Sequence, residues 1–260
     1  MLRICSLSTV NARYPGIGAI AVILQLVALE HADAADWYTG AALPKPSSDW
    51  IVAVDASATV TSSGSEFAAI SGTIAPIGSL NVSGPRLRIE GLAGTYKFDS
   101  ATPGVRITGE QMGGAILGGY QWKTPSSSFS VFGGVDIRDS QFSGKGVGLP
   151  AAGVREGFKA ALEYYAAPTE RSMIFAYGSY STIYNAYYTR AKYGIAPIGQ
   201  IYVGPEIAAL GDDLYRQWRV GVHATGLQFG GLQFGVSSGY QVDKSGKGGA
   251  YGSLDVRAVY

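Results

Sequence analysis

Cysteine and histidine are almost absent from this chain. Its 260 residues include one cysteine, Cys5, and two histidines, His31 and His223. Cys5 and His31 fall in a predicted N-terminal signal segment, so the mature chain is expected to have no disulfide and no set of zinc ligands. Carboxylates alone could hold calcium, but the sequence lacks the spacing of a calcium loop. We therefore predict no metal site and no other cofactor.

Charge is also scarce. Charged residues make up 15% of the chain, against about 25% in an average protein. The 20 basic residues nearly balance the 19 acidic ones, which gives a net charge of +1 and argues against nucleic acid as a partner. The glycine pairs Gly113-Gly114 and Gly230-Gly231 lack the Lys-Ser/Thr pair of a phosphate loop, so nucleotide binding is not expected.

The one long apolar run lies near the N-terminus. Arg3 and Arg13 precede this run, at 17–29, and a small-x-small pattern (ADA) follows at 32–34. These features predict a secretory signal peptide over residues 1–34. An uncleaved anchor helix is less favoured, because a membrane-spanning helix needs about 20 apolar residues. The rest of the sequence has no comparable run, so no transmembrane helix is predicted.

Glycine and tyrosine are abundant instead. The 37 glycines are about twice the usual share, and there are 17 tyrosines. Residues 35–49 show no periodicity and are predicted to be an extended lead-in. From Trp50 onward, alternating segments separated by turn residues predict one all-β domain over 50–260, with about twelve strands and ten as the alternative. The predicted strands are 50–60, 66–75, 85–98, 105–122, 128–139, 154–166, 171–181, 184–194, 199–210, 214–227, 231–242 and 249–260.

The last of these segments shows most clearly what kind of sheet is expected. Successive side chains of a strand point to opposite faces. One face of the segment is apolar and carries Leu254, Val256, Ala258 and Tyr260. The other carries Asp255 and Arg257. This pattern fits a strand with one face in lipid and one in a wet lumen, although a soluble barrel could also show it.

Two further features favour an antiparallel up-and-down β-barrel of outer-membrane type over a soluble periplasmic barrel. Connections alternate in length as expected for such a barrel: the fifth, Ser140–Gly153, is the longest, whereas the second, Pro76–Gly84, should be short and is not. Aromatic residues also gather near segment ends, as interfacial girdles would. They are Trp50, Tyr96, Phe98, Tyr120, Trp122, Tyr180, Tyr184, Tyr240 and Tyr260. The predicted location is the outer membrane.

Several segments resemble a known family. They include YSTIYNAYYTRAKYG (180–194), GAYGSLDVRAVY (249–260), GPRLRIEGLAGTYKF (84–98), GGAILGGYQW (113–122) and the region 203–241. Together these segments are similar to the cellulose biosynthesis protein BcsS family of alphaproteobacteria. The resemblance implies a secreted envelope protein associated with cellulose production, with other cellulose secretion components as partners. It carries over no active-site residue.

The charged faces of the strands supply the candidate site. Their side chains could line a lumen in which aromatic rings stack on sugars while charged groups bind the hydroxyls of a glucan. Lumen filling by paired charges is the alternative. The candidate residues are Arg88, Glu90, Lys159, Glu163, Tyr187, Arg190, Glu206, Arg219, His223, Asp255 and Arg257.

The expected function is therefore non-enzymatic: an outer-membrane barrel that supports cellulose secretion as a conduit or as an anchoring component. The first alternative is a plugged structural or adhesion barrel that binds polysaccharide or envelope partners through external loops. A weaker one is an envelope lipid hydrolase. It rests on His223 and Thr225, which are two apart on one strand face, with no identifiable orienting partner.

Overall fold

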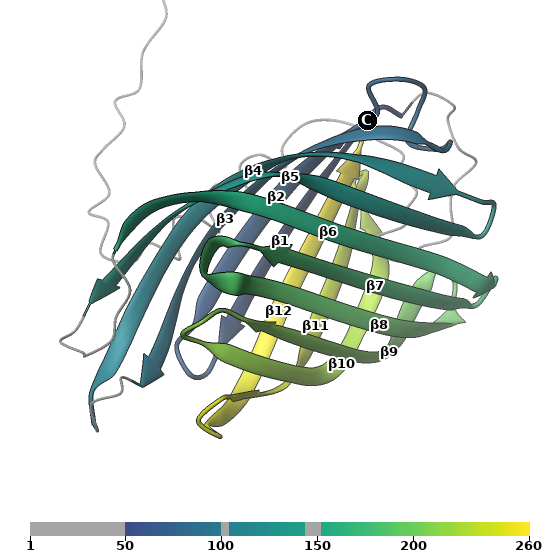
Figure 1. The fold of residues 1–260 in the computed structure, drawn as a ribbon. Helices are drawn as coiled ribbons and strands as arrows, with labels where there is room; N and C mark the ends of the chain where they lie inside the picture. The colour runs from purple at the N-terminus through teal and green to yellow at the C-terminus, as the bar shows by residue number, and fades with distance from the viewer. Residues whose placement is uncertain (1–49, 100–103, 144–151) are drawn as a thin grey trace, which may run out of the picture.

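The computed structural model describes residues 50–99, 104–143 and 152–260, which form one closed barrel (Figure 1). Each strand pairs antiparallel with its sequence neighbours, and β12 pairs with β1, so the predicted up-and-down barrel is confirmed. The predicted signal peptide and lead-in lie outside the described residues. The strands are β1 (Val52–Thr61), β2 (Glu66–Ile74), β3 (Gly84–Asp99), β4 (Arg106–Lys123), β5 (Ser127–Ser143), β6 (Gly153–Thr169), β7 (Ser172–Ser181), β8 (Ala186–Ile198), β9 (Ile201–Gly211), β10 (Arg216–Phe229), β11 (Leu232–Asp243) and β12 (Gly248–Val259).

All twelve predicted strands are present, so the count is twelve rather than ten. The largest boundary errors concern β5, which was expected to end at Asp139 but continues to Ser143, and β8, which was expected to end at Gly194 but continues to Ile198. For β5 the register explains the extension, since Ser140 pairs with Gln111 and Ser143 pairs with Thr108 of the long strand β4. A short 3₁₀ turn, η1 (Ile183–Asn185), separates β7 from β8, so β8 begins at Ala186 rather than at the predicted residue 184.

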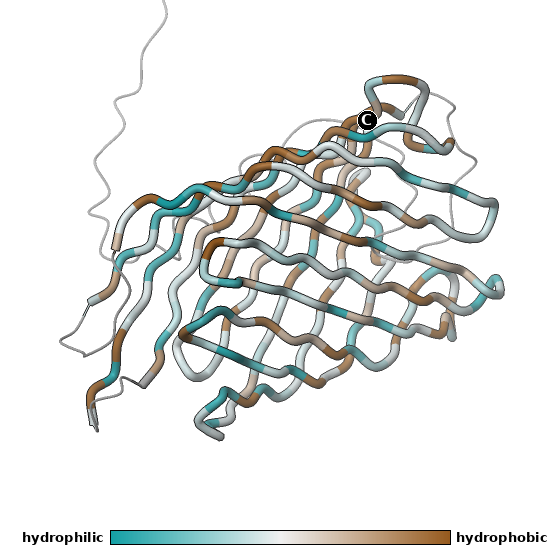
Figure 2. Tube along the Cα trace, viewed as in Figure 1, coloured by the Kyte–Doolittle hydropathy of each residue, from teal (hydrophilic) through white to brown (hydrophobic). Residues whose placement is uncertain are grey.

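Alternation along each strand divides the barrel wall into two faces (Figure 2). On β10, Trp218, Val220 and Val222 are exposed on the outside, whereas Arg219 and His223, on the opposite face of the strand, are buried inside. An apolar outside and a charged inside are the reverse of a soluble barrel and the arrangement of a barrel that spans a membrane. The fold is therefore of the outer-membrane type.

No helix among the described residues is long and apolar enough to cross a membrane.

The predicted aromatic girdle is partly wrong. Tyr120, Trp122, Tyr180, Tyr240 and Tyr260 are exposed on the outer face or at the barrel rim, as a girdle requires. The other four predicted members are buried: Trp50, Tyr96, Phe98 and Tyr184. Tyr96 and Phe98 of β3 are buried because side chains alternate along a strand, and these even-numbered positions share the inner face with Arg88. A strand-end aromatic joins the girdle only when its parity points it outward.

The barrel end that holds Trp50 and Tyr260, called here the terminal end, is covered by the connection between β2 and β3. Leu80 of this connection packs in a buried cluster with Trp50, Ala75 and Val259, and its backbone N–H donates to the Trp50 carbonyl at 2.7 Å. Lys123 Nζ donates to the Leu80 carbonyl at 3.2 Å. The connection is longer than its position predicts because it folds over the terminal end.

The opposite end, called here the far end, is filled by aromatic residues. Tyr96, Phe98, Ile107 and Tyr215 form a buried cluster there. The rings of Tyr96 and Tyr215 lie 5.6 Å apart between centroids, although they come from β3 and from the turn before β10. Apolar clusters at both ends thus leave the charged residues in the middle of the lumen.

Candidate functional site

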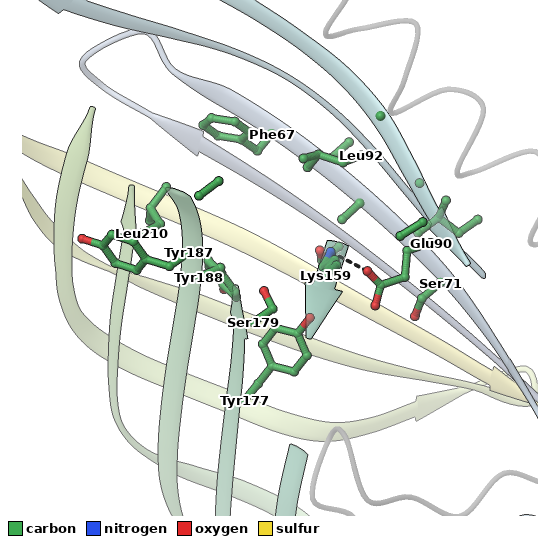
Figure 3. Close-up of a pocket in the computed structure, with 18 of the residues that line it drawn as sticks. Phe67, Ser71, Glu90, Leu92, Lys159, Tyr177, Ser179, Tyr187, Tyr188 and Leu210 are labelled. Carbon is green, nitrogen blue, oxygen red and sulfur yellow. Dashed lines mark hydrogen bonds and ion pairs between the residues drawn. The ribbon is translucent and has the colours of Figure 1, made fainter. Parts of the chain in front are cut away.

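Four charged side chains from β3 and β6 form the first ion-pair network. Arg88 Nη2 lies 2.6 Å from Glu163 Oε2 and its Nη1 lies 4.0 Å from Glu90, which also pairs with Lys159 (Figure 3). The Arg88 guanidinium also lies over the Phe132 ring, 4.0 Å from its centroid. Two strands separate β3 from β6 in the barrel wall, so these contacts cross the lumen.

The second ion-pair network joins β8, β9 and β12. Arg190 contacts Asp255 Oδ1 and Glu206 Oε2, each at 2.9 Å. Lys192 Nζ lies 2.9 Å from Asp255 Oδ2 and 3.7 Å from Glu206. The hydroxyl of Ser237 on β11 donates to Glu206 at 2.7 Å. Asp255 is fully buried, so each charge depends on its partners rather than on water.

A third pair spans the seam that closes the barrel. Arg257 Nη1 on β12 lies 3.3 Å from Asp55 Oδ1 on β1, and the two residues face each other in the register. They are 202 residues apart in sequence. The opposite charges in all three groups balance one another, so the middle of the lumen holds interlocked ion pairs.

A cavity of about 250 Å³ lies between the two networks and the far end. Glu90 and Lys159 border it, as do the aromatic side chains of Tyr177 and Tyr188 (Figure 3). The Tyr177 and Tyr188 rings lie 5.9 Å apart between centroids. The cavity thus combines aromatic faces with charged and hydroxyl groups, which is the chemistry that sugar binding uses.

The turn between β9 and β10 closes part of this cavity. Asp212 Oδ1 accepts the backbone N–H groups of Leu214 and Tyr215 at 2.7 and 2.8 Å. Burial raises the pKa of Asp212 above its ordinary value, even though these two hydrogen bonds oppose the shift. Because Asp212 accepts these two backbone hydrogen bonds, its side chain stabilises the turn.

The structure places ten of the eleven predicted site residues on the inner face. Seven of them are in the two networks: Arg88, Glu90, Lys159, Glu163, Arg190, Glu206 and Asp255. Arg257 is in the seam pair, and Arg219 and His223 lie on β10. Tyr187 is apart from them. It borders the cavity (Figure 3), but it lies three residues before Arg190 and opposite the exposed Tyr180 in the register, so strand alternation gives it the other face.

Sequence reasoning missed several inner residues, four of which belong to the ion pairs and the cavity described above. Lys192 and Tyr188 each lie two positions from Arg190, and Asp55 faces Arg257, so strand parity alone could have identified them. Tyr177 had a weaker signal, because its inner position follows from its register with Arg190 on β8.

His223 and Thr225 do share one face, but their surroundings do not suit catalysis. His223 Nε2 donates to the Tyr193 carbonyl at 3.0 Å, and Thr225 Oγ1 lies 3.4 Å from His223 Nδ1. Thr225 is fully buried, and neither residue borders the cavity, so a substrate has no place beside the hydroxyl. Within the described residues, no group of three His, Cys, Asp or Glu side chains is arranged to hold a metal ion.

Comparison with known proteins gives a family and several similar barrels. A family model described as cellulose biosynthesis protein BcsS matches residues 56–260. Among solved structures, KdgM porin is 10% identical, with 80% of this chain and 99% of that chain covered and a TM-score of 0.45. The transport unit of the autotransporter AIDA-I from Escherichia coli is 11% identical, with coverages of 95% and 99% and a TM-score of 0.44. No match is found among curated proteins.

Proposed function

We propose that this chain, which belongs to the cellulose biosynthesis protein BcsS family, is a non-enzymatic outer-membrane barrel that anchors cellulose or its secretion machinery at the cell surface. The observation that carries the anchoring role is the lumen itself. Ion pairs cross it between β3 and β6 and between β8 and β12. Opening a path for a glucan would separate these buried charges, which costs several kcal/mol for each pair broken.

The outer face supports the membrane location. Large apolar side chains stand exposed along neighbouring strands, for example Ile116, Val135, Phe158, Ile207 and Val222. A soluble protein rarely exposes so extended an apolar surface, whereas a lipid-facing barrel requires it. We place Trp50 and Tyr260 on the periplasmic side, which puts the far end outside the cell. The contacts with cellulose or with secretion partners would then be made by far-end turns that the structure describes, such as the one between β9 and β10.

Export through the barrel is the second candidate function. One observation favours it: Tyr177 and Tyr188 present aromatic surface to the cavity beside the charged groups of the first network. A glucan could slide along such surfaces if the ion pairs rearranged around it. The anchoring role needs no such rearrangement, and we therefore prefer it.

A deletion strain distinguishes the two functions. Without the chain, the anchoring role predicts that cellulose is still exported but is shed, so the cellulose bound to cells falls several-fold while that in the medium rises. Re-expression of the full chain should restore the cell-bound fraction. Cellulose in both fractions is measured after enzymatic digestion to glucose.

Loss of cellulose from cells and medium together would contradict anchoring and favour the conduit. An unchanged distribution would contradict both roles. A control strain that carries an unrelated barrel from the same promoter accounts for general effects on the envelope.

A further inference from the structure

We propose that Arg219 forms the centre of a lumenal binding site for the carboxylate of an acidic saccharide. Arg219 lies on β10, is 7% exposed and borders the cavity between the two networks and the far end. The inference goes beyond the proposed role in cellulose anchoring and does not depend on it.

Arg219 differs from the other lumen charges in its partners. A guanidinium carries five N–H donors. Within the described part of the chain, no carboxylate forms an ion pair with Arg219, and its Nε has no hydrogen-bond partner. Nη2 makes one long hydrogen bond, 3.4 Å to Gln217 Oε1, an atom that already accepts the Tyr215 hydroxyl at 2.9 Å. A buried cation with so few partners is costly, and an anionic ligand would supply what is missing.

Arg86 is another buried arginine that forms no ion pair with the described residues, and its hydrogen bonds show how the barrel satisfies such a side chain. Its Nε and Nη2 both donate to Gln121 Oε1, at 3.1 and 2.9 Å. Its Nη1 and Nη2 also donate to backbone carbonyls of Pro85, Ser79 and Val82. Arg86 therefore has a structural role at the terminal end, whereas Arg219 borders the cavity with its Nε unpartnered.

The carboxylates of the second network and of the turn before β10 are already engaged. Glu206 and Asp255 are held by Arg190 and Lys192, and Asp212 on the cavity wall accepts the turn amides. The Arg219 guanidinium lies over the Tyr251 ring, 5.5 Å from Cζ to the ring centroid, which is within the range of a cation–π contact.

The surroundings indicate what carries the anion. A planar carboxylate fits the guanidinium fork with two parallel hydrogen bonds. Tyr96, Tyr188 and Tyr215 border the same cavity and offer aromatic faces and hydroxyls to a sugar ring. A saccharide with a carboxylate would use both features, whereas a free inorganic ion would use only the arginine.

Calorimetric titration of the full chain in detergent micelles tests the site, with D-glucuronate as the acidic probe. Glucose is the neutral control, and inorganic phosphate is the probe for a free oxyanion. The variants are R219Q, R219K and the matched control R86Q, each checked for folding by heat-modifiable gel migration. R219Q breaks no ion pair, and R219K keeps the charge but loses the fork.

We expect glucuronate to bind the wild type about tenfold or more tightly than glucose does. R219Q should weaken glucuronate binding by about tenfold or more, R219K should weaken it to a lesser extent, and folded R86Q should bind as the wild type does. No binding to the wild type, or equal binding to wild type and R219Q, would overturn the site. Phosphate binding as tight as that of glucuronate would overturn the saccharide assignment.

Discussion

Replacement of Asp255 by alanine should lower the free energy of unfolding by about 3–5 kcal/mol. Asp255 is fully buried and pairs with both Arg190 and Lys192 at 2.9 Å. Its removal leaves two buried cations that share the single carboxylate of Glu206, and their uncompensated charge is the main cost. Urea unfolding in phospholipid vesicles, followed by tryptophan fluorescence, measures the effect.

Glu156 provides the matched control for this prediction. It is exposed near the start of β6, so Glu156→Ala should change the stability by no more than about 0.5 kcal/mol. The double variant Asp255→Ala, Lys192→Met should be more stable than Asp255→Ala alone, because it removes one of the unpaired cations. Equal stabilities for Asp255→Ala and Glu156→Ala would mean that the second network does not hold the lumen together.

Arginine in place of Val222 should cost about 2–4 kcal/mol. Val222 is near the middle of β10, is 62% exposed and faces outward between Pro205 and Ser238. A charge placed there would meet the hydrocarbon core of the bilayer. The same vesicle unfolding assay measures the loss, together with the fraction of chain that inserts.

The control for the lipid-facing position is Ile77→Arg. Ile77 is also an exposed apolar residue, at 73%, but it lies in the connection between β2 and β3 rather than in a strand. This variant should insert and unfold like the wild type. If Val222→Arg had an equally small effect, the outer face of β10 would not be in contact with lipid.

The strands could be predicted from the sequence because one local rule determines both their existence and their faces. Alternation placed Arg88 and Glu90 of one strand, and Asp255 and Arg257 of another, on the inner face. All four side chains do lie inside. The prediction is wrong where a residue is assigned by its type alone, without the alternation rule. Tyr96 was assigned to the girdle because it is a strand-end aromatic, whereas its even position on β3 turns it inward.

The pairing of the lumen charges could not be predicted, because it depends on which strands face each other across the barrel. Arg88 of β3 meets Glu163 of β6 over a separation of 75 residues, and Arg190 of β8 meets Asp255 of β12 over a separation of 65 residues. That Arg219 has no carboxylate partner among the described residues becomes evident only once the ion pairs of the other lumen charges are known. The position of the β2–β3 connection over the terminal end could not be predicted either, because nothing in the local sequence indicates that Leu80 contacts Trp50.

Envelope fractionation of the full chain, combined with gel migration with and without boiling, tests most directly whether this chain is a lipid-embedded barrel with its charges inside. We expect the chain to partition with the outer membrane. We also expect the unboiled chain to migrate differently from the boiled one, because a closed barrel of twelve strands resists detergent until it is heated. Release with the soluble periplasm, with no change in migration on boiling, would contradict a lipid-embedded barrel.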